Sequence, residues 1–364
     1  METGLRNVEV VESAITTITS DGLFFRGIAV DQLIGRATFE ELAFLLWHDR
    51  RPSAPEQRDF SAAYTKAWML PGSAVAAIQG LPSQAGPLLA LQAAIPFLAA
   101  VDPEREDTSL AAEERRAVRV LAQVPAALAC RHWGMPVARL DPGGSLAAQL
   151  LRALGSKPVP PAVADSALIL YADHELAAST FAARIAAAAG SNLYDGLSAG
   201  LAVLRGPLHG GAMIEVATLL RSLALAPRLD TAISSVLAEA ARIPGFGHSV
   251  YQDGDPRAAH FRRLAEQIAA GEARRWLDVA SALEERVLRE RHLHANADLY
   301  SVVFMHAAGL RDQAMLALFA VARTAGWIAH MLEQHRNNRL IRPRARYTGS
   351  FGRSWETPSL PSSS

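Results

Sequence analysis

The chain contains almost no cysteine and no excess of charge of either sign. Cys130 is the only cysteine among 364 residues, so an intramolecular disulfide is excluded. A reducing compartment fits this cysteine usage, and a free cysteine is most often a small buried apolar side chain. Lysine plus arginine number 36, as do aspartate plus glutamate. A formal net charge of zero gives no indication of binding to nucleic acid or to a membrane surface.

The first residues also lack the features of a secretory signal. Residues 1–22 contain no basic stretch followed by an apolar run, so we expect no signal peptide. The apolar stretches elsewhere are rich in alanine, and Arg, Asp, Glu or Gly interrupts each of them too soon for a membrane span. We therefore expect a cytoplasmic protein.

Helical patterns dominate what is present. The chain is 50% hydrophobic and 20% charged, as in globular proteins, and is long enough for a large core and two domains. Thr38 followed by Glu41 predicts a capping box at a helix start. Asp255 predicts another helix start because Pro256 follows it, and Asp230 predicts an N-cap.

No run alternates apolar and polar residues well enough for an extended sheet. Only a short hairpin is expected, over residues 15–26 with a turn at Asp21-Gly22. Segment 161–190 is so rich in alanine that helices can approach it closely, so we expect it at the centre of the fold. Segment 141–161 contains several Pro and Gly residues and predicts a pair of loops. Further helices are predicted at 192–204, 212–226, 230–243, 256–271, 272–292 and 313–335.

Three loops concentrate polar residues that core packing does not need, at residues 206–211, 244–257 and 294–301. Each places a His or an Asp beside glycine or at a helix start, where backbone can approach a ligand. Familiar cofactor motifs are missing. His174-Glu175 is followed by Ala178 where a zinc-protease helix needs histidine. No phosphate-binding loop occurs, and we expect no metal.

Taken singly, the candidate residues also have purely structural interpretations. His174 could be a satisfied core histidine, Asp298 only a helix N-cap, and Arg257 a solvated residue of a first helical turn. The combination of motifs favours function. ADHELAAST, GPLHGG, GFGH with DPRA after it, NADLYS, and GWIAHMLEQ with RLIRPRA and YTG occur in this order along the chain.

In order and spacing, these motifs resemble those of citrate synthases, and the similarity covers residues 8–349. The resemblance implies an all-α, two-domain fold. A large domain of residues 1–208 and 312–364 would provide the dimer contacts, and a small domain of residues 209–311 would be inserted into it. It also implies an acyltransferase that uses a CoA thioester as co-substrate and needs no other cofactor.

The resemblance also assigns roles to individual residues. His209 matches the histidine that donates a hydrogen bond to the thioester oxygen, and Asp298 matches the base that removes a proton from the methyl group. His248 matches the donor to the keto oxygen of oxaloacetate. The remaining matches are a second histidine and three arginines that bind oxaloacetate: His174, Arg257, Arg323 and Arg342. Because the last arginine of the family reaches the neighbouring subunit, Arg342 implies a homodimer.

These assignments agree with elementary chemistry. A dianionic substrate needs planar donors that are always charged, and arginine supplies bidentate contacts that lysine cannot. The methyl group of a thioester is a very weak acid. A carboxylate can deprotonate it only if a placed donor stabilises the enol oxygen at the same time. His209 must be neutral to act as that donor.

The CoA side departs from the family pattern. We expect Gly245, Phe246, Gly247 and Arg344 to contact CoA. Ser249 and Gln252 stand where relatives often carry basic residues, and Asp253 adds a negative charge. The expected reaction is condensation of acetyl-CoA with oxaloacetate to citrate. Two alternatives are open: 2-methylcitrate synthesis from propionyl-CoA, and a weakly active paralogue that binds a dicarboxylate.

Overall fold

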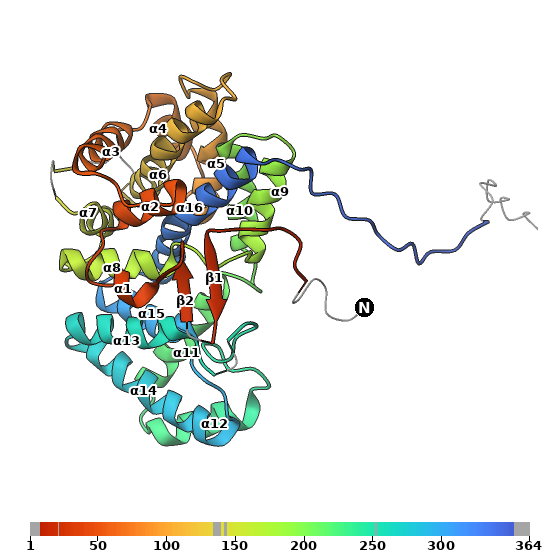
Figure 1. Cartoon of the computed structure of the whole chain (residues 1–364). Coiled ribbons are helices and arrows are strands. Elements are labelled where there is room, and N and C mark those ends of the chain that lie inside the picture. Colours follow the sequence, from red (N-terminus) through yellow and green to blue (C-terminus); the bar gives the residue numbers. More distant parts are fainter. Residues whose placement is uncertain (1–7, 21, 134–139, 142–143, 252, 353–364) are drawn as a thin grey trace, which may run out of the picture.

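The computed structural model describes residues 8–20, 22–133, 140–141, 144–251 and 253–352. Across these residues the chain forms sixteen helices and one small sheet (Figure 1). The prediction of an all-helical fold is confirmed. The buried hydrophobic residues form one contiguous core.

The sheet is the predicted hairpin with one further strand, but Gly22 begins β2 and does not lie in the turn, and Asp21 lies outside the described residues. Strand β1 (Thr16–Thr19) pairs antiparallel with β2 (Gly22–Phe25), which pairs with β3 (Ile28–Ala29). Ile15 and Phe25 are buried and attach the sheet to the core. Strand β3 was not predicted, because two residues are too few to show a pattern.

Most helices form one group around a central helix. These are α1 (Val30–Leu33), α2 (Phe39–His48), α3 (Ala54–Ala67), α4 (Gly72–Gln79), α5 (Pro87–Ala100), α6 (Leu110–Trp133), α7 (Leu146–Ala153), α8 (Pro161–Tyr171), α9 (Ala178–Ala188) and α10 (Leu193–Leu204). Helix α16 (Asp312–Arg336) contacts α2, α5, α6, α8, α9 and α10. By length and composition α16 could cross a membrane, but its apolar stretch is entirely buried inside the protein. It is therefore the core helix of this group.

The other helices lie together in the lower part of Figure 1. They are α11 (Ala212–Leu225), α12 (Leu229–Glu239), α13 (Pro256–Ile268), α14 (Glu272–Arg291) and α15 (Ala297–Ala307). Helices α13 and α15 pack along each other, and α11 and α14 both contact α15. Because α13 also touches α8, the N-termini of α13 and α15 lie near the core of the first group.

The predicted helix starts can be compared with the observed caps. Thr38 accepts from the Glu41 amide while Glu41 accepts from the Thr38 amide, so the capping box is confirmed. Asp255 caps α13, also as predicted. The expectation for Asp230 is wrong: Arg228 is the N-cap of α12, and Asp230 lies inside the first turn. There its charge still suits the helix dipole.

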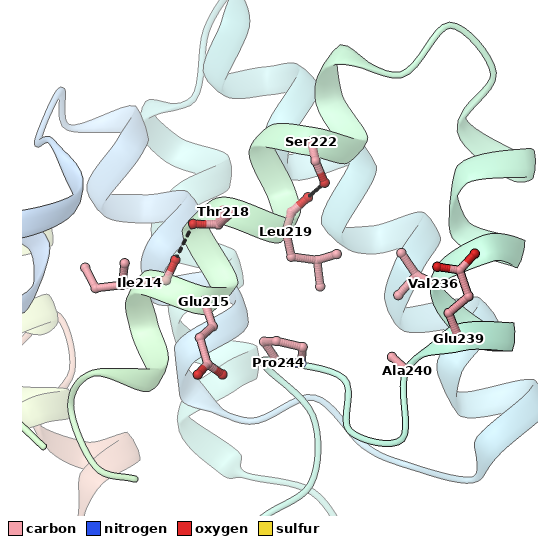
Figure 2. Close-up of a pocket in the computed structure, with 9 residues that line it drawn as sticks. All are labelled: Ile214, Glu215, Thr218, Leu219, Ser222, Val236, Glu239, Ala240 and Pro244. Carbon is pink, nitrogen blue, oxygen red and sulfur yellow. Dashed lines mark hydrogen bonds between the residues drawn. The ribbon is translucent and has the colours of Figure 1, made fainter. Parts of the chain in front are cut away.

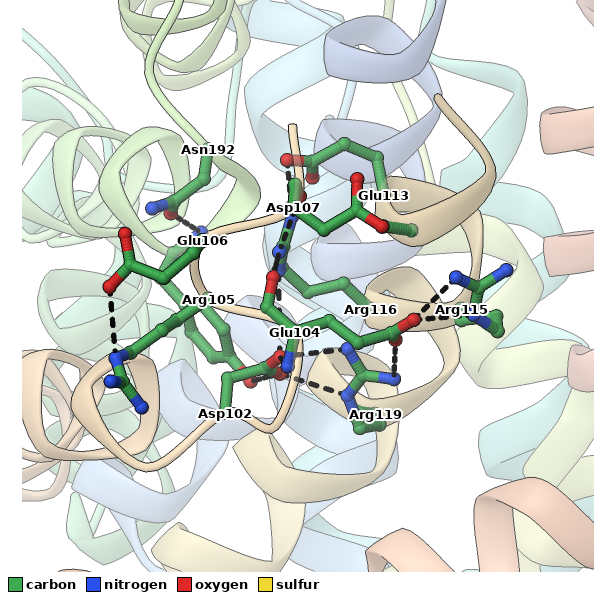
Figure 3. A network of polar contacts seen from close by, with 12 residues as sticks. Asp102, Glu104, Arg105, Glu106, Asp107, Glu113, Arg115, Arg116, Arg119 and Asn192 are labelled. Atoms are coloured by element: carbon green, nitrogen blue, oxygen red, sulfur yellow. Dashed lines mark hydrogen bonds and ion pairs between the residues drawn. The ribbon is translucent and has the colours of Figure 1, made fainter. Parts of the chain in front are cut away.

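A network of ion pairs fastens the loop after α5 to helices α6 and α10 (Figure 3). The buried Asp102 accepts from Arg119 at 2.8 and 2.9 Å and from the Tyr194 hydroxyl at 2.9 Å. Arg119 also donates to Glu104 at 2.7 Å. Since both oxygens of Asp102 accept hydrogen bonds, the network ties this loop to α6 and α10.

After α16 the chain leaves the body of the protein as an extended arm, residues 340–352 (Figure 1). Nearly all of the arm is exposed, including Leu340, Tyr347 and Phe351. Arg342 and Arg344 lie on it and are exposed as well.

Candidate active site

His174 lies in a break between two helices and not on a helix. Helix α8 ends at Tyr171 and α9 begins at Ala178, although the whole segment is rich in alanine. The ring is buried, and its Nε2 is 3.2 Å from the Tyr251 hydroxyl. The pKa of His174 is well below its ordinary value, because burial removes water and because Arg257 and Arg323 add positive charge nearby. This imidazole is therefore neutral.

His248 has its proton on a defined nitrogen. Its Nδ1 accepts from the amides of Val250 at 3.0 Å and Tyr251 at 3.3 Å. A neutral ring that accepts at Nδ1 carries its hydrogen on Nε2. Burial, and then the charge of Arg257, lower the pKa of His248 to about 4. The side chain is thus a neutral hydrogen-bond donor through Nε2.

The opposite tautomer is favoured at His209. Its Nε2 is 2.8 Å from the Ser179 hydroxyl, and that hydroxyl accepts from the indole nitrogen of Trp327 at 3.3 Å. The serine proton is then free to point at Nε2, which leaves the imidazole hydrogen on Nδ1. Burial, and then Arg323, lower the pKa of His209 to about 4. His209 meets the requirement for a neutral donor.

Asp298 is not the cap of its helix. The cap of α15 is Asn296, whose side chain accepts from the Asp298 amide at 3.0 Å. Burial raises the pKa of the Asp298 carboxyl to about 6, although Arg257 acts in the opposite direction. A carboxylate that is ionised at neutral pH but more basic than usual suits a general base.

The two buried arginines, Arg257 and Arg323, differ in how many of their nitrogens donate hydrogen bonds within the protein. Arg257 donates to Asp255 from Nε at 3.0 Å and from a terminal nitrogen at 2.8 Å. Arg323 donates from Nε to the Tyr171 carbonyl at 2.8 Å. Burial lowers the pKa of Arg323 to about 10, so it is charged at neutral pH. Its terminal nitrogens are the groups that an anionic ligand can reach.

The structure brings most of the predicted residues together. The rings of His174 and His248 lie 5.2 Å apart between centroids, and Arg257 lies 6.0 Å from the Tyr251 ring centre. The charge of Arg323 acts on His174, His209 and Asp298. Arg342 and Arg344 do not join this cluster, because both lie on the extended arm.

The predicted CoA-contacting glycines connect two of the three loops. The Gly247 amide donates to the His294 carbonyl and the Asn296 amide donates to the Gly245 carbonyl, both at 2.9 Å. Gly245 and Gly247 adopt φ of 87° and 74°, where other residues are strained. Ser249 and Asp253 are exposed near this connection, whereas Gln252 lies outside the described residues.

Three residues of the site were not singled out as site residues from the sequence. Ser179 orients His209, Tyr251 contacts His174, and Asp255 pairs with Arg257. Asp255 was recognised only as a helix cap. Ser179 lies inside the ADHELAAST motif and Tyr251 lies in the loop of residues 244–257, but nothing local indicates which side chain each would contact.

Two cavities of this conformation are lined by residues outside the cluster. One of about 530 Å³ opens between α11 and α12 (Figure 2) and is lined by Ile214, Glu215, Thr218, Leu219, Ser222, Val236, Glu239, Ala240 and Pro244. Another of about 470 Å³ lies near Arg131 and Gln313. Neither wall includes a described histidine or arginine of the cluster. Within the cluster Arg323 is only 1% exposed, whereas His209, His248 and Asp298 are partly exposed.

The composition of the cluster indicates which chemistry its side chains can perform. Among the described residues no group of three His, Cys, Asp or Glu side chains is placed to hold a metal ion. The cluster consists instead of neutral imidazole donors, two arginines and a basic carboxylate. Together these groups define an enzyme that binds a small anion and moves a proton beside it.

The comparisons with known proteins agree with that class. The model of the family "Citrate synthase, C-terminal domain" matches residues 4–344. The chain is 36% identical to citrate synthase 2 of Bacillus subtilis, over 95% of each protein. It is 31% identical to 2-methylcitrate synthase of Shewanella oneidensis, over 95% of this chain and 94% of the relative.

A solved structure is also similar over nearly its whole length. The ternary complex of carboxymethyl coenzyme A and oxaloacetate with citrate synthase from Thermoplasma acidophilum matches with a TM-score of 0.90 and 29% identity, covering 98% of both chains. This chain belongs to the citrate synthase family. Members of that family take CoA thioesters as substrates and need no cofactor.

Proposed function

We propose that this chain condenses acetyl-CoA with oxaloacetate and then hydrolyses the thioester to give citrate and CoA. The observation that carries the proposal is the pair of neutral histidines with opposite tautomers, His209 and His248, beside a carboxylate whose pKa is raised to about 6. Condensation needs one donor for each carbonyl oxygen and one base. The family membership of the chain supports the same reaction.

The first step forms the enol of the thioester. Asp298 takes a proton from the methyl carbon while the Nδ1 hydrogen of His209 bonds to the thioester oxygen. The electron pair of the broken C–H bond moves into the new C=C bond, and the developing charge on oxygen is stabilised by the hydrogen bond. The low pKa of His209 keeps this donor neutral.

The second step forms the carbon–carbon bond. The enol carbon attacks the keto carbon of oxaloacetate while the thioester C=O bond forms again, and the negative charge that develops on the keto oxygen is stabilised by a hydrogen bond from Nε2 of His248. The two carboxylates of oxaloacetate are held by Arg257, Arg323 and His174, which the family assigns to this substrate. Water then attacks the thioester carbonyl, and CoA leaves as the thiol.

A partner subunit completes the site in this proposal. The exposed arm carries Arg342 and Arg344 away from their own site, which supports a homodimer in which Arg342 binds oxaloacetate and Arg344 approaches CoA across the interface. We also propose the domain division at residues 208–209 and 311–312. Movement of residues 209–311 would open the site. The buried Cys130 fits a cytoplasmic location.

The acyl donor distinguishes the two main versions of this function. Curated relatives of similar identity include both citrate synthases and 2-methylcitrate synthases. One methylene changes binding by only about 1–3 kcal/mol, so the pocket shape decides. We expect release of CoA thiol with oxaloacetate and acetyl-CoA, with propionyl-CoA slower. Absence of release with any acyl-CoA, together with calorimetric binding of oxaloacetate, would favour the weakly active paralogue.

A separate prediction concerns the loop after His248. Ser249→Arg combined with Gln252→Lys is expected to lower the KM for acetyl-CoA by roughly threefold at low ionic strength, because exposed ion pairs are each worth under about 1 kcal/mol. The KM for oxaloacetate should not change. The matched control is Ser249→Gln with Gln252 retained, which adds length without charge. A KM for acetyl-CoA that is the same in all three proteins means that the CoA phosphates lie elsewhere.

A further inference from the structure

The helix break that carries His174 is held by one face of the central helix. Within α16, Arg323, Gly326 and His330 are spaced three and four residues apart and therefore share a face. Arg323 donates to the Tyr171 carbonyl at 2.8 Å, and the Gly326 amide donates to the Ala172 carbonyl at 3.1 Å. His330 completes this face against the next residue of the chain.

That next residue is a fully buried carboxylate. Asp173 is 0% exposed, and its Oδ2 lies 3.3 Å from Nε2 of His330. The other nitrogen of His330 accepts from Arg184 at 3.1 Å, since a guanidinium can only donate. The neutral imidazole therefore carries its hydrogen on Nε2 and donates it to Asp173. Arg184 in turn is paired with Glu333 at 2.7 Å.

The contact between the break and α16 leaves no spare room. A Cβ on Gly326 would lie 2.3 Å from both the Ala172 carbonyl oxygen and Oδ1 of Asp173. On the outer side, Glu175 adopts a left-handed φ of 50°, which is strained for this residue, and its carboxylate accepts from the Ile18 amide at 2.8 Å. A strained residue fixed from both sides indicates a break whose shape matters for function.

We infer that Asp173 and His330 are positioning residues for oxaloacetate binding: they set the break so that His174 faces the substrate beside Arg323. This inference rests on the proposed function. His174 directly follows Asp173, and Arg323 donates to the Tyr171 carbonyl where the break begins, so a displaced break changes the position of His174 relative to Arg323. The carboxylate of Asp173 is held beside the site by His330 and by the nearby Thr16 side chain.

The test compares two buried aspartates of the same alanine-rich segment. Asp165 on α8 is also buried and accepts from the Phe39 amide at 3.0 Å, but it does not contact the break. Asp173→Asn is expected to raise the KM for oxaloacetate about tenfold, because loose support of binding groups typically costs this much or more. The KM for acetyl-CoA should change little. Asp165→Asn should change neither KM.

A pair of variants at His330 guards against misfolding as the cause. His330→Gln places an amide donor where Nε2 was and should keep the KM for oxaloacetate close to the parental value, whereas His330→Leu removes the donor and should behave like Asp173→Asn. Equal changes of both KM values, or a KM for oxaloacetate unaltered in Asp173→Asn and His330→Leu, would overturn the inference. A parent protein that neither binds oxaloacetate nor releases thiol instead overturns the proposed function, and the inference falls with it.

Discussion

Replacing Asp298 by asparagine is expected to lower kcat by about 10²–10⁴-fold, the usual loss when a general base is removed. The structure makes the alternative role of this residue testable, because Asn296 and not Asp298 caps α15. Oxaloacetate binding, measured by calorimetry, should be retained. Near-parental turnover of the variant would mean that Asp298 does not remove the methyl proton.

The folded state of the Asp298→Asn variant should be no less stable than the parent at neutral pH. Burial raises the pKa of Asp298 to about 6, above its ordinary value of 3.8. The ionised form therefore opposes folding, and this group stabilises the protein progressively as pH falls through 6. Asparagine carries no charge to bury. A melting temperature at pH 7.5 well below that of the parent would indicate a structural role for the carboxylate.

The same pKa predicts an acid limit of activity. Only the ionised carboxylate can accept a proton, so kcat/KM for acetyl-CoA should fall below about pH 6, approaching tenfold per pH unit. His209 and His248 remain neutral across this range because their pKa values are lowered to about 4. If kcat/KM instead falls with a midpoint near pH 3.8, the ordinary pKa of aspartate, the base is a more exposed carboxyl.

Local signals in the sequence were sufficient where the interaction is itself local. The capping box at Thr38 and the cap at Asp255 join residues two or three apart, and both were predicted correctly. The segment 141–161 was predicted as loops, yet it contains α7, which Ser145 caps. Its Pro and Gly residues lie around the helix, and burial against the core stabilises eight residues that no propensity alone would hold.

The features that decide the chemistry depend on contacts far apart in the chain. The tautomer of His209 depends on Ser179 and Trp327, which lie 30 and 118 positions away in the numbering. The break at residues 172–177 interrupts an alanine-rich segment, and α16 supplies hydrogen-bond donors to the carbonyls of Tyr171 and Ala172 at its start. Motifs could identify the reacting residues. They could not show which nitrogen of each ring carries the hydrogen.

A second large effect is expected from Arg342. If the arm completes the partner's site, Arg342→Ala should almost abolish turnover, because losing one member of a buried charge pair costs about 2–5 kcal/mol. Mixing this variant with Asp298→Asn subunits then gives a specific outcome. In a heterodimer, one site has both defects, while the other combines an intact Asp298 with an intact Arg342 from the other chain.

Random exchange makes half of the dimers mixed, and each mixed dimer has one intact site, so about a quarter of parental activity should return. An arm that folds back on its own chain gives no intact site in any combination and no recovery. The exchange itself is checked by native mass spectrometry of differently tagged subunits. Mixed dimers that form but remain inactive would place Arg342 in its own subunit's site. The control mixture pairs Asp298→Asn with Arg346→Ala, which replaces another exposed residue of the arm. Its activity should equal that of the Arg346→Ala subunits measured by themselves.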